Sequence, residues 1–145
     1  MQISHVGIEA VKEHEGCRTV AYRDTGGVWT MGYGTIRIDG LPVEEGMTCT
    51  LQQATQWLTD DLSWAQTAVN QQVKVPLKQN QFDALVSFVY NVGRNAFAKS
   101  TLLRLLNQGD YAGAAKQFDR WVFDNGVVQR GLLARRRVER EMFLA

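Results

Sequence analysis

The apolar positions of the first fifteen residues follow the spacing of an α-helix. Ile8 and Val11 lie on one face, and Glu15 falls on that same face when successive residues turn by about 100°. Ser4 is a suitable N-cap, and Gly16 is a suitable end. The pattern therefore predicts a short helix whose last turn carries a carboxyl group on its apolar side.

A change of pattern after residue 16 predicts β-structure. Short apolar stretches flank the turn-forming sequence TGG at residues 25–27, so residues 20–34 are expected to form a β-hairpin, followed by further strand or turn to about residue 42. Alternation places Thr30, Gly32 and Gly34 on one face of the returning strand. We expect this face of small residues to allow the close approach of a ligand.

The remainder of the chain has helical patterns. Thr50 and Gln53 have the spacing of a capping box and open an amphipathic run that predicts one helix over residues 51–71. Residues 80–92 are apolar on nearly all sides, which predicts a buried helix ending at Gly93. The other expected helices are residues 100–109, 110–126 and 131–145, with Ser100 and Asp110 as N-caps of the first two.

The order of these elements indicates an α+β protein that is mainly helical. A small lobe of about residues 1–50 holds the first helix and the hairpin, and a larger helical lobe covers about residues 72–145. The helix of about residues 51–71 connects them. With 145 residues, 45% of them hydrophobic, the chain suits one domain with a sizeable core.

Charge and composition exclude several classes of function. Acidic residues outnumber basic ones in residues 1–60, and the reverse holds in residues 61–145, but the net charge is only +1. This small charge argues against nucleic acid as a partner. No apolar run reaches the roughly 20 residues of a membrane span, so no stable membrane insertion is expected. His5 and His14 lack a metal-binding pattern, and we expect a monomer without metal or cofactor.

Two cysteines, Cys17 and Cys49, have no metal-type spacing and are too few for a disulfide framework. We expect reduced, structural thiols. Because Cys17 follows Glu15 by two residues, a regulatory disulfide stays open as an alternative.

The first helix and the hairpin carry two carboxyl groups in different surroundings. Glu15, on an apolar face in the last turn of a helix, loses hydration and meets the negative end of the helix dipole, which favours its protonated form. Asp24 lies in a solvated turn and is expected to be ionised, with Thr30 across the hairpin placed to hold a water. Such a pair cleaves glycosidic bonds. Taken singly, each residue is more often structural.

The combination is more specific than its parts. Glu15, Asp24 and Thr30 fit E-x8-D-x5-T, and the surrounding E-G-x-R-x-x-A-Y-x-D-x-x-G-x-x-T-x-G-Y-G resembles the phage-type lysozymes (endolysins) of glycoside hydrolase family 24. The stretches QNQFDALVSFVYNVG and GLLARRRVERE extend the likeness over nearly the whole chain. The resemblance implies a lysozyme-like fold, with Glu15 as general acid, Asp24 as second carboxylate and Thr30 as the residue that positions a water.

The implied reaction is hydrolysis of the β-1,4 bond between N-acetylmuramic acid and N-acetylglucosamine in bacterial peptidoglycan, with inversion, to lyse the host cell at the end of a phage cycle. The protein would be made in the host cytoplasm and released by a separate holin to act in the periplasm. Two alternatives stay open. One is a lytic transglycosylase, which Asp24 argues against, and the other is a non-catalytic module that binds peptidoglycan or nucleic acid.

Several further residues are candidates for binding substrate. Tyr22 and Tyr33 could stack on sugar rings, although aromatic residues on a half-buried hairpin more often belong to the core. Gly32 belongs to the face of small residues. Asn91, at the end of the buried helix, is either a helix-terminal group or a hydrogen-bonding partner of an acetamido sugar.

The last helix carries a basic run, which is more often a solvated face than a binding site. Arg136 projects to the apolar side of that helix, near Leu132 and Phe143. It is the arginine expected to form a buried ion pair with a carboxylate, and Glu15 is one candidate partner.

Overall fold

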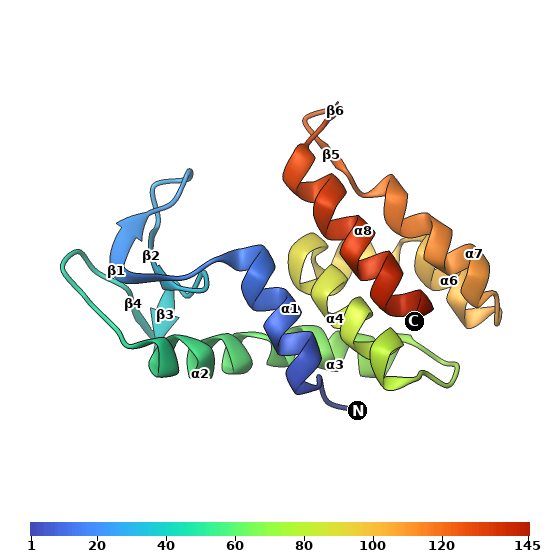
Figure 1. The fold of residues 1–145 in the computed structure, drawn as a ribbon, viewed down its shortest axis with the longest axis horizontal. Coiled ribbons are helices and arrows are strands. Elements are labelled where there is room, and N and C mark those ends of the chain that lie inside the picture. The colour runs from blue at the N-terminus through green and yellow to red at the C-terminus, as the bar shows by residue number, and fades with distance from the viewer. The chain divides into compact units, whose positions relative to one another are not determined.

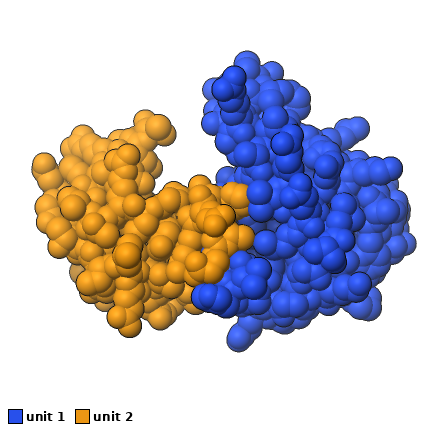
Figure 2. Space-filling view, in the orientation of Figure 1, with its two compact units in different colours: residues 1–8, 64–145 blue, residues 9–63 orange.

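The computed structural model describes residues 1–145, and the chain forms two compact units (Figures 1 and 2). Unit 2, residues 9–63, contains most of the first helix and two hairpins. Unit 1, residues 1–8 and 64–145, is helical apart from one short hairpin. No helix in either unit has both the length and the apolar character that crossing a bilayer requires.

The first helix is confirmed at both ends. Helix α1 (His5–Glu15) begins after Ser4, whose Oγ accepts the backbone N–H of Gly7 at 3.3 Å. It ends before Gly16, which has a φ of +66°, a left-handed conformation that glycine adopts without steric cost. Glu15 is therefore the last helical residue.

The predicted hairpin forms from β1 (Arg18–Arg23) and β2 (Trp29–Gly32), with Tyr22 opposite Thr30. The pairing becomes irregular between Arg18 and Tyr22, as at a β-bulge. A second, smaller hairpin follows, made of β3 (Arg37–Ile38) and β4 (Leu41–Pro42). Each hairpin is antiparallel and two-stranded.

The alternation predicted for β2 ends earlier than expected. Gly32 and Gly34 have φ values of +67° and +98°, which a regular strand does not allow, so β2 stops at Gly32. Helix α2 (Leu51–Asp61) packs against β2, and Thr30, Met31 and Gly32 are all buried. A Cβ on Gly32 would lie 3.1 Å from the Cβ of Ala54. Packing against α2 therefore explains this glycine better than an open ligand-binding face.

The single helix predicted over residues 51–71 is interrupted. Thr50 and Gln53 form the predicted capping box at the start of α2, and α3 (Ser63–Gln72) follows after one intervening residue. That residue, Leu62, has a ψ of −12°, closer to a tight 3₁₀ turn than to an α-helix, which interrupts the regular hydrogen-bond pattern.

The core of unit 1 forms around α4 (Gln79–Val92). Every residue from 82 to 89 is buried, and the helix ends at Gly93 with a φ of +93°, as predicted. Helix α8 (Arg130–Leu144) packs along α4 (Figure 1). The Phe88 ring meets three aromatic rings edge-on, with centroids 5.3 to 6.3 Å apart, from Phe97, Phe118 and Trp121. Three short helices complete the unit: α5 (Arg94–Ala98), α6 (Thr101–Asn107) and α7 (Tyr111–Gln117).

Ser100 and Asp110 cap α6 and α7 as expected, but the helix predicted over residues 110–126 is wrong in its second half. Asn125 and Gly126 have φ values of +50° and +78°, which suit a two-residue type I′ turn. The Asn-Gly turn outweighs the helical spacing of the apolar residues around it. The segments that replace the helix are a 3₁₀ turn (Phe118–Arg120), β5 (Phe123–Asp124) and β6 (Val127–Val128).

Candidate active site

Glu15 is half-buried at the end of α1, on the side of the helix that carries the fully buried Val11. Gly34 lies beside its carboxyl group, because a Cβ built on Gly34 would be 3.8 Å from Glu15 Oε2. The glycine leaves the space next to the carboxyl free of a side chain. A substituent bound there would meet the carboxyl group directly.

Asp24 occupies the exposed turn between β1 and β2. Its Oδ1 accepts two backbone N–H groups, from Gly26 at 2.9 Å and from Val28 at 2.8 Å. These bonds fix the orientation of the side chain. The second oxygen, Oδ2, has no hydrogen-bond partner in the protein, so one oxygen holds the turn and the other is available for chemistry.

Thr30 is buried, with 3% of its surface exposed, on β2. Its hydroxyl donates to the carbonyl oxygen of Val28 at 2.9 Å. Because the hydroxyl proton is used in this bond, Thr30 Oγ1 can act only as an acceptor towards a water molecule.

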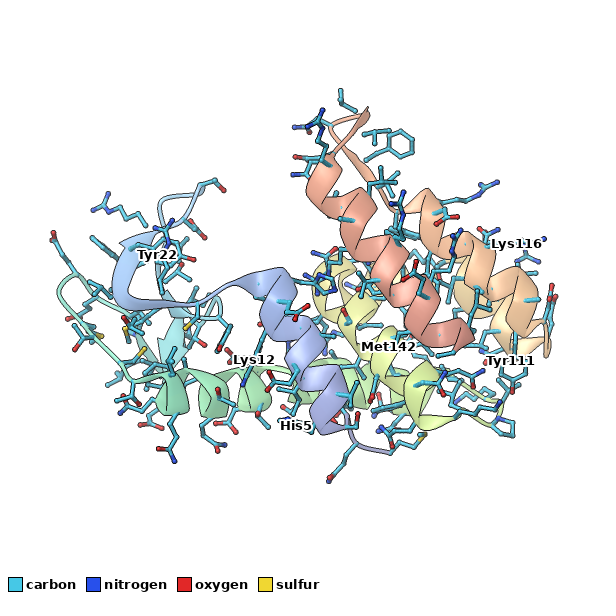
Figure 3. All side chains as sticks on the ribbon, in the orientation of Figure 1. His5, Lys12, Tyr22, Tyr111, Lys116 and Met142 are labelled. Atoms are coloured by element: carbon cyan, nitrogen blue, oxygen red, sulfur yellow. The ribbon has the colours of Figure 1, made fainter.

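Each predicted tyrosine has a cation over one ring face. The Arg18 guanidinium carbon lies 4.4 Å from the centroid of Tyr22, and Lys12 Nζ lies 5.7 Å from that of Tyr33. Figure 3 labels Tyr22 on β1 and Lys12 on α1. Both tyrosines are half-buried. Because a cation covers one face of each ring, a sugar would have to stack on the opposite face.

In unit 1, the exposed Asn91 lines a hollow of about 400 Å³. Its Oδ1 accepts a hydrogen bond from the Arg136 guanidinium, while its N–H groups have no protein partner. Free amide donors suit the carbonyl oxygen of an acetamido group. The other residues lining this hollow are Val92, Arg120, Trp121, Phe123 and Leu132.

Arg136 is fully buried and hydrogen-bonds to two residues that line this hollow, Trp121 and Asn91. Its Nε donates to the carbonyl oxygen of Trp121 at 3.0 Å, and it also donates to Asn91. It forms an ion pair with Glu139 of the same helix. Burial lowers the pKa of Arg136 and raises the pKa of Glu139, because each ionised form loses hydration. The structure thus gives Arg136 a carboxylate partner within α8.

Glu139 and three residues that line this hollow, Arg120, Trp121 and Phe123, were not among the predicted site residues. Glu139 follows Arg136 by three positions, a spacing that favours contact on a helix and that could have identified it. The Asn-Gly pair after Phe123 could have located the hairpin.

A larger hollow of about 630 Å³, lined in part by Trp64 and Arg94, contains none of the predicted catalytic residues. No group of three or more His, Cys, Asp or Glu side chains is placed to hold a metal ion.

The comparisons with known proteins agree with this fold. The phage lysozyme family model matches residues 12–139. The endolysin of Salmonella phage P22 is 46% identical over 146 residues, which cover 100% of this chain and 99% of the relative.

Two solved structures match over nearly all of both chains. The endolysin from Escherichia coli O157:H7 phage FAHEc1 is 44% identical with a TM-score of 0.94, covering 99% of this chain and 94% of that one. P22 lysozyme is 44% identical with a TM-score of 0.93, covering 100% and 99%. The predicted lysozyme-like α+β fold is confirmed. Both its sequence and its fold therefore place the chain in the phage lysozyme family.

Proposed function

We propose that this chain is an endolysin muramidase, which hydrolyses the β-1,4 bond between N-acetylmuramic acid and N-acetylglucosamine and lyses the host bacterium. Membership in the phage lysozyme family supports a glycoside hydrolase that acts on the cell wall. Among the residues, the hydrogen bonding of Asp24 gives the strongest support. Two backbone N–H groups donate to one oxygen of its carboxylate, whereas the other oxygen has no protein partner. Asp24 and Glu15 belong to the same unit.

Glu15 acts as the general acid in this proposal. Its carboxyl proton passes to the glycosidic oxygen as the bond between that oxygen and the anomeric carbon breaks. The leaving N-acetylglucosamine then departs as a neutral alcohol. Gly34 supports this assignment because it keeps the space beside the carboxyl open.

Asp24 and Thr30 orient the attacking water. Thr30 Oγ1 accepts one water O–H, since its own proton is donated to Val28, and Asp24 Oδ2 accepts the other. A water molecule that donates to both of these oxygens has a lone pair directed towards the anomeric carbon. Asp24 takes up the water proton as the new bond forms, and attack opposite the leaving oxygen inverts that carbon.

The alternatives make different demands on these residues. In a lytic transglycosylase the 6-hydroxyl of the sugar attacks, and no residue is needed to hold a water. A non-catalytic wall-binding module requires neither the acid nor the second carboxylate. The fixed Asp24 and the adjacent Thr30 favour the hydrolase.

Clearing of permeabilised Gram-negative cells by the wild type, Glu15→Gln and Glu13→Gln tests the proposal. Glu13 is an exposed residue of the same helix, so Glu13→Gln is a matched control. We expect Glu15→Gln to lose roughly 100-fold or more of the activity, as loss of a general acid does, and Glu13→Gln to keep it. Equal clearing by wild type and Glu15→Gln would refute the acid assignment, and 1,6-anhydro fragments would identify a transglycosylase.

The substrate lies outside the inner membrane, so the place of action in this proposal is the periplasm. We extend the proposal to a monomer made in the cytoplasm and released by a separate holin. Expression with and without a co-expressed holin tests this extension. Lysis only in the presence of the holin is expected, and prompt lysis by the chain alone would contradict it.

A further inference from the structure

The segment before α2 extends the first hairpin on its free side. The N–H of Cys49 donates to the carbonyl oxygen of Thr19 at 2.9 Å, and the N–H of Ala21 donates to that of Met47 at 2.9 Å. Residues 47–49 therefore run antiparallel to β1, opposite the side occupied by β2. This register fixes which side chains of the two segments are neighbours.

Cys17 and Cys49 are brought together by this register. Thr19 lies opposite Cys49, and Cys17 precedes Thr19 by two residues, immediately before β1 begins at Arg18. Both cysteines are half-buried and reduced in the structure. The pKa of Cys49 is raised first by burial and then by the charge of Cys17, which agrees with two neighbouring sulfur atoms.

We propose that Cys17 and Cys49 form an intramolecular disulfide when the protein meets an oxidising environment. The oxidant is a small-molecule or protein disulfide. The Cys17 thiolate attacks one oxidant sulfur to form a mixed disulfide, and one oxidant thiol leaves. The Cys49 thiolate then attacks the Cys17 sulfur, forms the new S–S bond and displaces the second oxidant thiol. The two protein thiols lose two electrons and two protons, which the oxidant gains.

The cross-link would close a loop that contains the candidate active-site turn. Cys17 follows Glu15 by two residues, and Cys49 directly precedes Thr50, the N-cap of α2. The loop includes Asp24 and Thr30. A bond across it restricts the unfolded chain and stabilises unit 2 after the protein leaves a reducing compartment. The inference does not depend on the reaction that the chain catalyses.

The test uses the purified full chain after incubation with oxidised glutathione or with a reducing agent. Free thiols are alkylated under denaturing conditions, and the masses of the intact protein and its peptides are measured. We expect the oxidised monomer to resist alkylation, to weigh two hydrogen atoms less, and to yield a linked pair of peptides that contain Cys17 and Cys49. Its Tm should exceed that of the reduced protein by about 10 °C.

Cys17→Ser and Cys49→Ser are the matched variants. Each should have the same Tm, within about 2 °C, with and without the oxidant, because no intramolecular bond can form. Alkylation of both cysteines in the oxidised wild type would overturn the proposal. Accumulation of glutathione adducts or disulfide-linked dimers in place of the intramolecular bond would also overturn it.

Discussion

Asp24 and Thr30 are joined through a single carbonyl group: the oxygen of Val28 accepts the backbone N–H of Asp24 and the hydroxyl of Thr30, each at 2.9 Å. The turn that carries the proposed base and the residue that positions the water therefore share one anchor. Their relative placement is thus set by hydrogen bonds within the hairpin.

Replacing Thr30 by valine tests the role of its hydroxyl group without changing the size of the side chain. Thr30→Val retains the shape of the buried side chain but cannot accept a hydrogen bond from water, so we expect wall-clearing activity to fall by about 10- to 100-fold. Thr30→Ser keeps the hydroxyl and should remain within a few-fold of the wild type. Initial clearing rates at equal folded concentration measure both. Equal activity of the two variants would mean that the hydroxyl does not orient the water.

Asp24→Asn should preserve the turn and remove the base. The amide oxygen of asparagine can still accept the N–H groups of Gly26 and Val28, so Tm should change by only a few degrees. Activity should fall by roughly 100-fold or more, because the amide cannot take up the proton of the water. Asp39→Asn, in the exposed turn between β3 and β4, is the control and should remain active. A highly active Asp24→Asn enzyme would contradict the assignment.

Glu139→Gln should destabilise unit 1. Glu139 is buried and forms ion pairs with Arg135 and Arg136, so its neutralisation removes a negative charge that two buried cations share. We expect a loss of about 3 to 5 kcal/mol in the free energy of unfolding, measured with urea. Glu141→Gln, at an exposed position of the same helix, should change it by less than about 0.5 kcal/mol. Similar stability of the two variants would show that the buried pairs contribute little.

The half-buried Asp61 should make stability depend on pH in a defined direction. Burial raises its pKa, while the hydrogen bond from Thr35 to Oδ2, at 2.8 Å, acts in the opposite direction. The folded state thus holds this proton to a higher pH than the unfolded chain does. Stability from this site is therefore lost as pH rises from the ordinary carboxyl value, about 3.9, through the folded pKa.

Asp61→Asn removes that titration. The free energy of unfolding of Asp61→Asn minus that of the wild type should therefore increase between about pH 3 and pH 7. Urea unfolding of both proteins across this range measures the difference. A difference that stays constant, or that falls as pH rises, would contradict the direction of the shift.

Local signals were sufficient to predict the elements that carry the candidate site. Ser4 and Gly16 mark the ends of α1 through capping and a left-handed backbone, both of which depend on adjacent residues. The buried helix α4 follows from a run that is apolar on nearly all sides. Glu15 and Asp24 became candidates through a motif in one continuous stretch that resembles a known family, and their catalytic roles stay predictions.

The features that the sequence analysis missed arise from tertiary contacts or from competing local signals. Gly32 packs against Ala54, a neighbour distant in sequence, and alternation along one strand cannot reveal that contact. Arg136 pairs with Glu139 because both are buried against α4, whereas the helical projection identified only the buried arginine. At Asn125, a turn conformation competes with helical periodicity and prevails.

The anomeric form of the first product tests the central claim most directly. Proton NMR of a purified, unbranched peptidoglycan oligosaccharide during hydrolysis distinguishes the α- and β-forms of the new muramic acid end before they equilibrate. A water held by Asp24 and Thr30 predicts that the α-anomer appears first. Initial formation of the β-anomer would show retention and contradict the role assigned to Asp24, and a 1,6-anhydro end would show that no water attacks at all.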